Sequence, residues 1–99
     1  MPFEMTAVLF VADQDQYARY RTEIAPLLEA TGGAFRYDFE VARALKSEAG
    51  HEINRVFLLR FPDREAKERF FTHPQYREIR SRLFDAAVRR MTIIAEHSV

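Results

Sequence analysis

The sequence predicts a single α+β domain over residues 1–99, with strands and helices in the order β-α-β-β-α-β. Three observations lead to this fold class. Apolar residues alternate with a period of two in four separate segments, as they do in strands. They recur every three or four residues in the longer segments between, as in amphipathic helices. Glycine or proline stands at several of the boundaries.

The first strand is expected at residues 3–11, where both alternating sets of side chains become apolar, as in a central strand buried on two faces. A helix should follow over about residues 14–31, capped by Asp13 or Asp15. Gly32-Gly33 should end it, because glycine accepts the left-handed conformation that follows many helices. The stripe of this helix that faces the core is predicted to hold Tyr17, Tyr20, Ile24, Leu27 and Leu28.

The second strand is predicted at about residues 34–45, with clean alternation that is typical of an edge strand with one polar face. One face should carry Phe35, Tyr37, Phe39 and Val41, and the other Arg36, Asp38 and Glu40. A polar turn at residues 46–53 leads to the third strand at residues 55–61. The short connection makes this pair of strands a hairpin.

The second half of the chain predicts a broken helical segment and a final strand. A short helix begins at Pro62-Asp63, and His73-Pro74 interrupts it, with Pro74 placed as the first residue of a new helix up to about residue 88. The side chains expected to face inward are Ala66, Phe70, Phe71, Tyr76, Ile79, Leu83 and Ala87. The last strand, at about residues 90–97, should place Met91, Ile93 and Ala95 opposite Thr92, Ile94 and Glu96.

This order of elements is the split-βαβ, ferredoxin-like arrangement, an antiparallel sheet with helices on one face. The first and third strands are apolar on both sides, so the sheet face without helices also presents apolar side chains. Such a face has to be covered, and a second copy of the chain is the simplest cover. We therefore expect a homodimer that forms through the open sheet face.

The composition narrows the classes of partner. There is no cysteine, which excludes disulfides and thiolate metal sites. Lysine plus arginine and aspartate plus glutamate balance at 15 each, which argues against dedicated nucleic-acid binding. No apolar stretch approaches the ~20 residues of a membrane helix. The N-terminal residues do not resemble a signal peptide, so a cytoplasmic location is the default expectation.

Several short stretches resemble a known family. The run from Asp15 to Arg21 resembles the opening of the first helix in a bacterial family described only as a domain of unknown function, number thirteen-thirty. Gly32-Gly33 is similar to that family's double glycine before its second strand. The family's second characteristic stretch is similar to Phe61-Pro62, Ala66, Phe70, Pro74-Gln75-Tyr76 and Arg80. The order and spacing of these residues over nearly the whole chain carry the resemblance.

The resemblance implies the dimeric α/β-barrel superfamily, in which two ferredoxin-like sheets pack face to face. Its members include cofactor-independent monooxygenases, haem-degrading enzymes, muconolactone isomerases and proteins without known activity. The family's own chemistry is not established, so it transfers no catalytic residues and implies no cofactor. Haem-degrading relatives use a set of asparagine, tryptophan and histidine, whereas this chain has Asn54 but no tryptophan. Residues 42–53 also depart from expectation, because this segment is longer and more charged, which puts the hairpin in question.

Arg80 is the most informative candidate for a binding residue. On a helical wheel it lies about 50° from the centre of the apolar stripe, next to Tyr76. An arginine at the rim of an aromatic cleft suits the carboxylate or enolate of a small substrate. The alternative is a structural arginine whose stem packs against the core while its head pairs with an acid or a carbonyl.

Tyr17 and Tyr20 share the inward stripe of the first helix, and their hydroxyls need partners if they are buried. They are either ordinary core residues or part of a ligand site between helix and sheet. The three histidines, His51, His73 and His97, have no spacing typical of metal ligands, so no metal site is predicted. His73 is interpreted as a helix cap or an exposed residue.

These observations favour a small dimeric protein that binds a small organic molecule, with Arg80, Tyr76, Tyr17 and Tyr20 as the candidate ligand-binding residues. The alternative is a cofactor-independent monooxygenase or isomerase that acts on a small aromatic or lactone substrate. Enclosed, converging polar groups would favour the enzyme. A binding or purely structural dimer does not require them.

Overall fold

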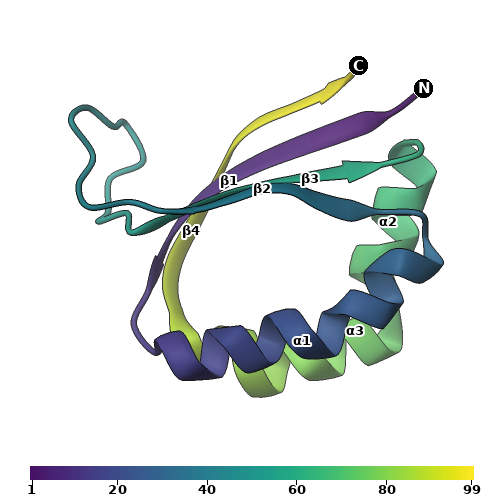
Figure 1. Ribbon diagram of the computed structural model, residues 1–99, viewed down its shortest axis with the longest axis horizontal. Helices are drawn as coiled ribbons and strands as arrows, with labels where there is room; N and C mark the ends of the chain where they lie inside the picture. The colour runs from purple at the N-terminus through teal and green to yellow at the C-terminus, as the bar shows by residue number, and fades with distance from the viewer.

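The computed structural model describes all 99 residues, and its strands form one sheet in the order β2-β3-β1-β4, in which every neighbouring pair is antiparallel. The strands are β1 (Phe3–Val11), β2 (Ala34–Glu40), β3 (Arg55–Phe61) and β4 (Val88–Ser98). The helices are α1 (Gln14–Ala30), α2 (Arg64–Thr72), α3 (Pro74–Ile79), the π-helical turn η1 (Arg80–Phe84) and α4 (Asp85–Ala87). All helices lie on one side of the sheet (Figure 1). The predicted α+β, ferredoxin-like fold is therefore confirmed.

The core fills the space between the two layers. On the helix-facing side of β1 and β3, side chains such as Leu9, Leu59 and Phe61 are at most 3% exposed. On the helix side, Tyr17 and Tyr20 of α1 are buried, as the periodicity predicts. Burial of this apolar area is the main term that stabilises the domain.

The ends of α1 follow from local chemistry. Asp13 is the N-cap, and its carboxylate accepts a hydrogen bond from the backbone N–H of Gln16 at 3.0 Å. At the other end, the N–H of Gly33 donates to the carbonyl of Leu28, and Gly32 adopts a φ of 79°. This is the left-handed helix ending that glycine favours, and it lets the chain turn directly into β2.

His73 is a helix cap, which is one of the two roles that the sequence suggested. Its Nδ1 accepts a hydrogen bond from the backbone N–H of Gln75 at 3.0 Å, and Pro74 is the first residue of α3. The expected break between the two helical segments is confirmed at this point.

The predicted faces of β2 are wrong beyond its second residue. The strand ends at Glu40 rather than residue 45, and its register with β3 shifts at Arg36. Such a bulge adds one residue, so every later side chain changes face. Phe35 faces the helices, whereas Tyr37 and Phe39 lie on the open face and are 51% and 55% exposed.

A second bulge changes the predicted faces of β4. The strand begins at Val88, and its register with β1 shifts so that Ile93 is opposite Ala7 while Ala95 is opposite Thr6. Because Thr6 and Ala7 point to opposite faces, Ile93 and Ala95 do so too. They do not share the face that the alternation alone assigned to them.

The helix after Pro74 is continuous to Ala87 but changes its winding at η1, where the N–H of Asp85 bonds to the carbonyl of Arg80. The sequence predicted regular α-helix with Leu83 facing inward. Both Leu83 and Phe84 are buried, because they continue the inward stripe that begins at Tyr76 and Ile79. Figure 1 shows this helix beside α1 under the sheet.

Residues 41–54 contain no helix or strand and project from one end of the sheet (Figure 1). The loop is tied back by Asn54, whose side chain bonds both the N–H and the carbonyl of Val11, at 2.7 and 2.9 Å. His51 makes a second tie, with Nε2 2.8 Å from the hydroxyl of Thr92. Asn54 and His51 therefore hold the loop in place.

Candidate functional site

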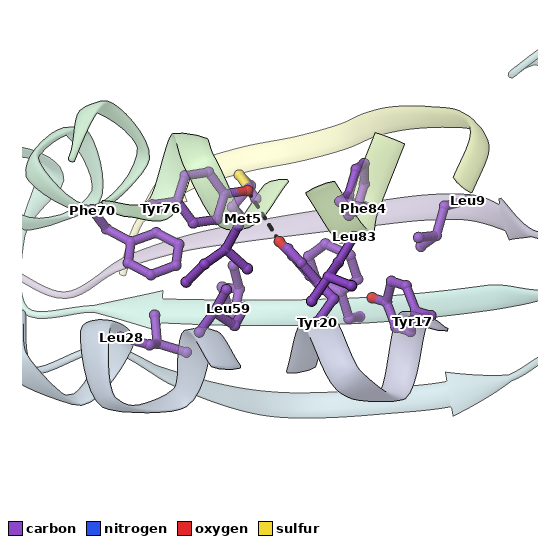
Figure 2. Close-up of a cluster of buried hydrophobic side chains, with 14 of the residues drawn as sticks. Met5, Leu9, Tyr17, Tyr20, Leu28, Leu59, Phe70, Tyr76, Leu83 and Phe84 are labelled. Atoms are coloured by element: carbon purple, nitrogen blue, oxygen red, sulfur yellow. Dashed lines mark hydrogen bonds between the residues drawn. The ribbon is translucent and has the colours of Figure 1, made fainter. Parts of the chain in front are cut away.

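A small cavity lies between the helices and the sheet, and both layers line it. The strands contribute Met5, Phe35, Phe57, Leu59 and Met91. The helices contribute Tyr17, Tyr20, Ile24, Phe70, Phe71, Tyr76, Arg80 and Phe84. Its volume is ≈ 20 Å³, which is room for about one water molecule. Figure 2 shows part of this wall, with the tyrosines from α1 and α3 directed toward one another.

Tyr20 and Tyr76 join the two helices across the cavity. Their hydroxyl oxygens are 3.0 Å apart, and either one can be the donor (Figure 2). Burial raises the pKa of both phenols, while the nearby charge of Arg80 acts in the opposite direction. Both therefore remain neutral hydrogen-bonding groups near neutral pH.

Tyr17 is fully buried, and its hydroxyl has no hydrogen-bond partner in the protein. Its ring lies 5.5 Å from that of Tyr20, and the guanidinium of Arg55 lies over it at 4.8 Å. Burial, followed by the charge of Asp38, raises the pKa of the Tyr17 phenol. This hydroxyl is thus a buried donor that the protein itself does not use.

Arg80 lies at the rim of the cavity, where 38% of its side chain is exposed. Its guanidinium lies 4.8 Å from the centre of the Phe84 ring, and its Nε is 3.6 Å from a carboxylate oxygen of Asp85. Residues five apart on an α-helix point about 140° away from each other, so only the π turn brings Asp85 to this side. The pair is too long for a hydrogen bond, so Asp85 does not occupy the donors of Arg80, whose other polar neighbour is the Tyr76 hydroxyl.

A second arginine cluster lies at the β2 edge of the same interior. Arg55 donates to both carboxylate oxygens of Asp38, at 2.8 and 2.9 Å, and Arg21 also pairs with Asp38. The hydrogen bond to Asp38 raises the pKa of Arg55. Sequence reasoning missed this cluster, because it assigned Asp38 to the face opposite Phe35. The only sign of this cluster in the sequence was the acidic Asp38 among the aromatic residues of β2.

The structure brings all four sequence-predicted residues, Arg80, Tyr76, Tyr17 and Tyr20, to the wall of this one cavity. His51, His73 and His97 lie elsewhere, and none of them lines it. The polar groups at the cavity are three neutral phenols and one guanidinium. Such a set can hold an acceptor-rich or anionic group, and it contains no carboxylate that could act as a base.

The fold and this cavity define the class: an α+β protein with a ferredoxin-like fold and a helix–sheet cavity. Within this class, the family model for a domain of unknown function, DUF1330, matches residues 5–97. The chain therefore belongs to that family. A search among curated proteins finds no match.

Solved structures show the same fold at low sequence identity. A protein of unknown function from Rhodopseudomonas palustris is 21% identical with a TM-score of 0.80, over 97% of this chain and 80% of that one. A dabb family protein from Mesorhizobium loti is 16% identical with a TM-score of 0.70, over 99% and 96%. A dimeric ferredoxin-like protein of unknown function from Thermobifida fusca is 15% identical with a TM-score of 0.62, over 100% and 92%. No helix here has the length and apolar character needed to cross a membrane.

Proposed function

We propose that this protein is a homodimer that binds a small organic molecule, anionic or aromatic, in the cavity between its helices and its sheet. The observation that carries the proposal is the position of Arg80, whose guanidinium stands at the rim of an aromatic cavity without a hydrogen-bonded acid. An anionic group at this point would replace water and the distant Asp85 as its partner.

The surroundings strengthen a bond at Arg80. The cavity wall is almost entirely aromatic or aliphatic, so the local dielectric is low and a charge-assisted hydrogen bond is stronger than in water. Tyr76 and Phe84 line the cavity beside the guanidinium and give it an aromatic wall for an apolar ring. An aromatic carboxylate combines the two features that this wall can recognise.

The cavity has to widen before a ring can enter, because its present volume is that of about one water molecule. The side chains that can move to widen it are at the rim, where four residues are only partly buried: Phe35, Phe71, Arg80 and Met91. Methionine is the most adaptable of these side chains. Ligand entry is expected to displace these four residues and to leave the buried phenols in place.

The dimer is proposed from the open sheet face. Tyr37 and Phe39 are each about half exposed there, next to the apolar side chains of Val8, Val56 and Leu58. Exposed aromatic groups beside apolar side chains are typical of a protein interface. The structures from Thermobifida fusca and from Jannaschia are both described as dimeric ferredoxin-like proteins. A second copy is therefore the occupant that we propose.

Binding is better supported than an oxygenase or isomerase activity. Those reactions need a group that removes a proton from the substrate. Burial holds the three phenols protonated, so none serves as a base near neutral pH. The same protonated phenols are well suited to donate hydrogen bonds to a bound ligand.

Binding is tested by titrating benzoate, phenylacetate and salicylate into the protein by NMR. Arg80→Met keeps the stem and removes the guanidinium, so it should weaken Arg80-dependent binding by tenfold or more. Arg82→Met is the matched control, because Arg82 lies on the same turn, pairs with Glu23 and Glu78, and does not line the cavity. Equal binding by the two variants, or no binding by any of the acids, would contradict the proposal.

The dimer is tested by light scattering at micromolar concentration, which should give about twice the 11.7 kDa chain mass. Phe39→Arg should halve this mass without unfolding the protomer, because Phe39 is 55% exposed in the single chain. Leu45→Arg is the control, since Leu45 is 86% exposed in the loop and lies outside the sheet face. A wild-type mass of one chain would rule out the dimer.

A further inference from the structure

The hydroxyl of Tyr17 calls for a partner that the protein does not provide. Only two buried side-chain nitrogen or oxygen atoms in the chain lack a hydrogen-bond partner, the Tyr17 hydroxyl and Nε of Arg21. An unpaired buried hydroxyl destabilises a fold, so its retention calls for an explanation. Tyr17 lines the cavity, and its oxygen is directed toward the interior beside Tyr20 (Figure 2).

The polar groups around the cavity are matched to oxygen acceptors. Tyr17 offers one free O–H. In the Tyr20–Tyr76 pair one hydroxyl donates to the other, which leaves the second O–H free. Arg80 is a donor only, and no lining side chain carries a carboxylate or an amide. A ligand with an acceptor at each end satisfies both Arg80, which can only donate, and the O–H of Tyr17.

We infer that the ligand is a small oxo acid, with its carboxylate at Arg80 and a second oxygen, carbonyl or ether, accepting from the Tyr17 hydroxyl. This inference rests on the proposed function, because it uses the same cavity and the same arginine. It adds the class of ligand, which is one apolar ring or branched chain with acceptor oxygens at both ends.

Aromatic rings line the path between Arg80 and Tyr17. The ring of Tyr20 stands between the other two tyrosines, 5.5 Å from Tyr17 and 6.4 Å from Tyr76. It also lies 5.0 Å from Phe84, on which Arg80 rests. Tyr20 and Phe84 therefore stand between Arg80 and Tyr17 along the wall of the cavity. A single six-membered ring with oxygens at opposite positions is the probe chosen for this path, and it can enter only after the cavity widens.

The test compares two acids that differ by one carbonyl, cyclohexanecarboxylate and 4-oxocyclohexanecarboxylate. Their dissociation constants are measured by calorimetry for the wild type, Tyr17→Phe and Tyr37→Phe. Tyr17→Phe keeps the ring and removes only the unpaired hydroxyl, so the variant should remain folded. Tyr37→Phe is the matched control, because Tyr37 lies on the open face and outside the cavity.

The wild type and Tyr37→Phe should bind the oxo acid about three- to tenfold more tightly than the plain acid, which is the range of one neutral hydrogen bond. Tyr17→Phe should bind the two acids equally. The inference is overturned if Tyr17→Phe still prefers the oxo acid, or if the wild type shows no preference between the two acids. In either case, binding of both acids that depends on Arg80 would still support the proposed function. Failure of both acids to bind also overturns the inference, and the benzoate series then decides the proposed function separately.

Discussion

Two arginine–aspartate groups lie at opposite edges of the same interior, and they differ in how tightly the aspartate binds the arginine. At the β2 edge, Arg55 donates hydrogen bonds to both carboxylate oxygens of Asp38, at 2.8 and 2.9 Å. At the edge near β4, Arg80 and Asp85 stand 3.6 Å apart, and 60% of the Asp85 side chain is exposed. Asp38 engages Arg55 through two hydrogen bonds, whereas Asp85 makes none with Arg80.

This difference indicates which arginine is free to bind a ligand. A two-pronged bond to a mostly buried carboxylate fixes both partners and stabilises the link between β2, β3 and α1. A loose, exposed pair contributes almost nothing measurable to stability. Arginine at a cavity is therefore a binding candidate only where its own acid holds it weakly, and Arg80 meets this condition while Arg55 does not.

The largest effect should come from the core that both clusters share. Leu59 is 3% exposed and lines the cavity between them. Leu59→Ala should lower the free energy of unfolding by about 2–5 kcal/mol, because the cavity it creates cannot fully collapse. Chemical denaturation measures this, with the exposed Leu45→Ala as the control. If Leu59→Ala were as stable as the control, the packing of β3 described above would be wrong.

The comparison itself is tested most directly by removing the two acids. Asp38→Asn should cost about 2–3 kcal/mol, since it breaks charge-assisted bonds and leaves two arginines without their counter-ion. Asp85→Asn should cost less than about 0.5 kcal/mol. Thermal or urea unfolding of both variants measures the difference. Equal losses would show that the two clusters are not different in kind.

A smaller effect separates two tyrosines that lie one turn apart on α1. Tyr20→Phe should cost about 1 kcal/mol, because it leaves the Tyr76 hydroxyl without its partner. Tyr17→Phe should leave stability unchanged or raise it, because its hydroxyl has no bond to lose. The two variants are matched in size and position. A larger loss for Tyr17→Phe would reveal a partner for that hydroxyl in the free protein.

Much of the fold follows from sequence periodicity, and the exceptions have one physical cause. The strands β1 and β3 were predicted with their observed bounds, because each is a mainly apolar run with polar or proline residues near its ends. The faces of β2 and β4 were mispredicted because a bulge adds a residue that no composition signal marks. The π turn at η1 was missed for the same reason.

The candidate site was predictable as a set of positions but not as a set of bonds. Helical periodicity brought Tyr17, Tyr20 and Tyr76 to one interior, and placed Arg80 at its rim. It could not tell that Tyr20 and Tyr76 satisfy each other while Tyr17 has no partner. Those outcomes depend on ångström-scale distances between elements that are far apart in the chain.

The bulge at Arg36 makes this point of β2 tolerant of a change in length. Loss of the Arg36 codon would close the bulge, and Tyr37 and Phe39 would stay on the open face with Asp38 still toward the helices, because each keeps its partner on β3. Loss of one residue there would therefore shorten the strand without exchanging its two surfaces. Within the family, lineages that differ by one residue at this position should keep the same inner and outer faces of this strand.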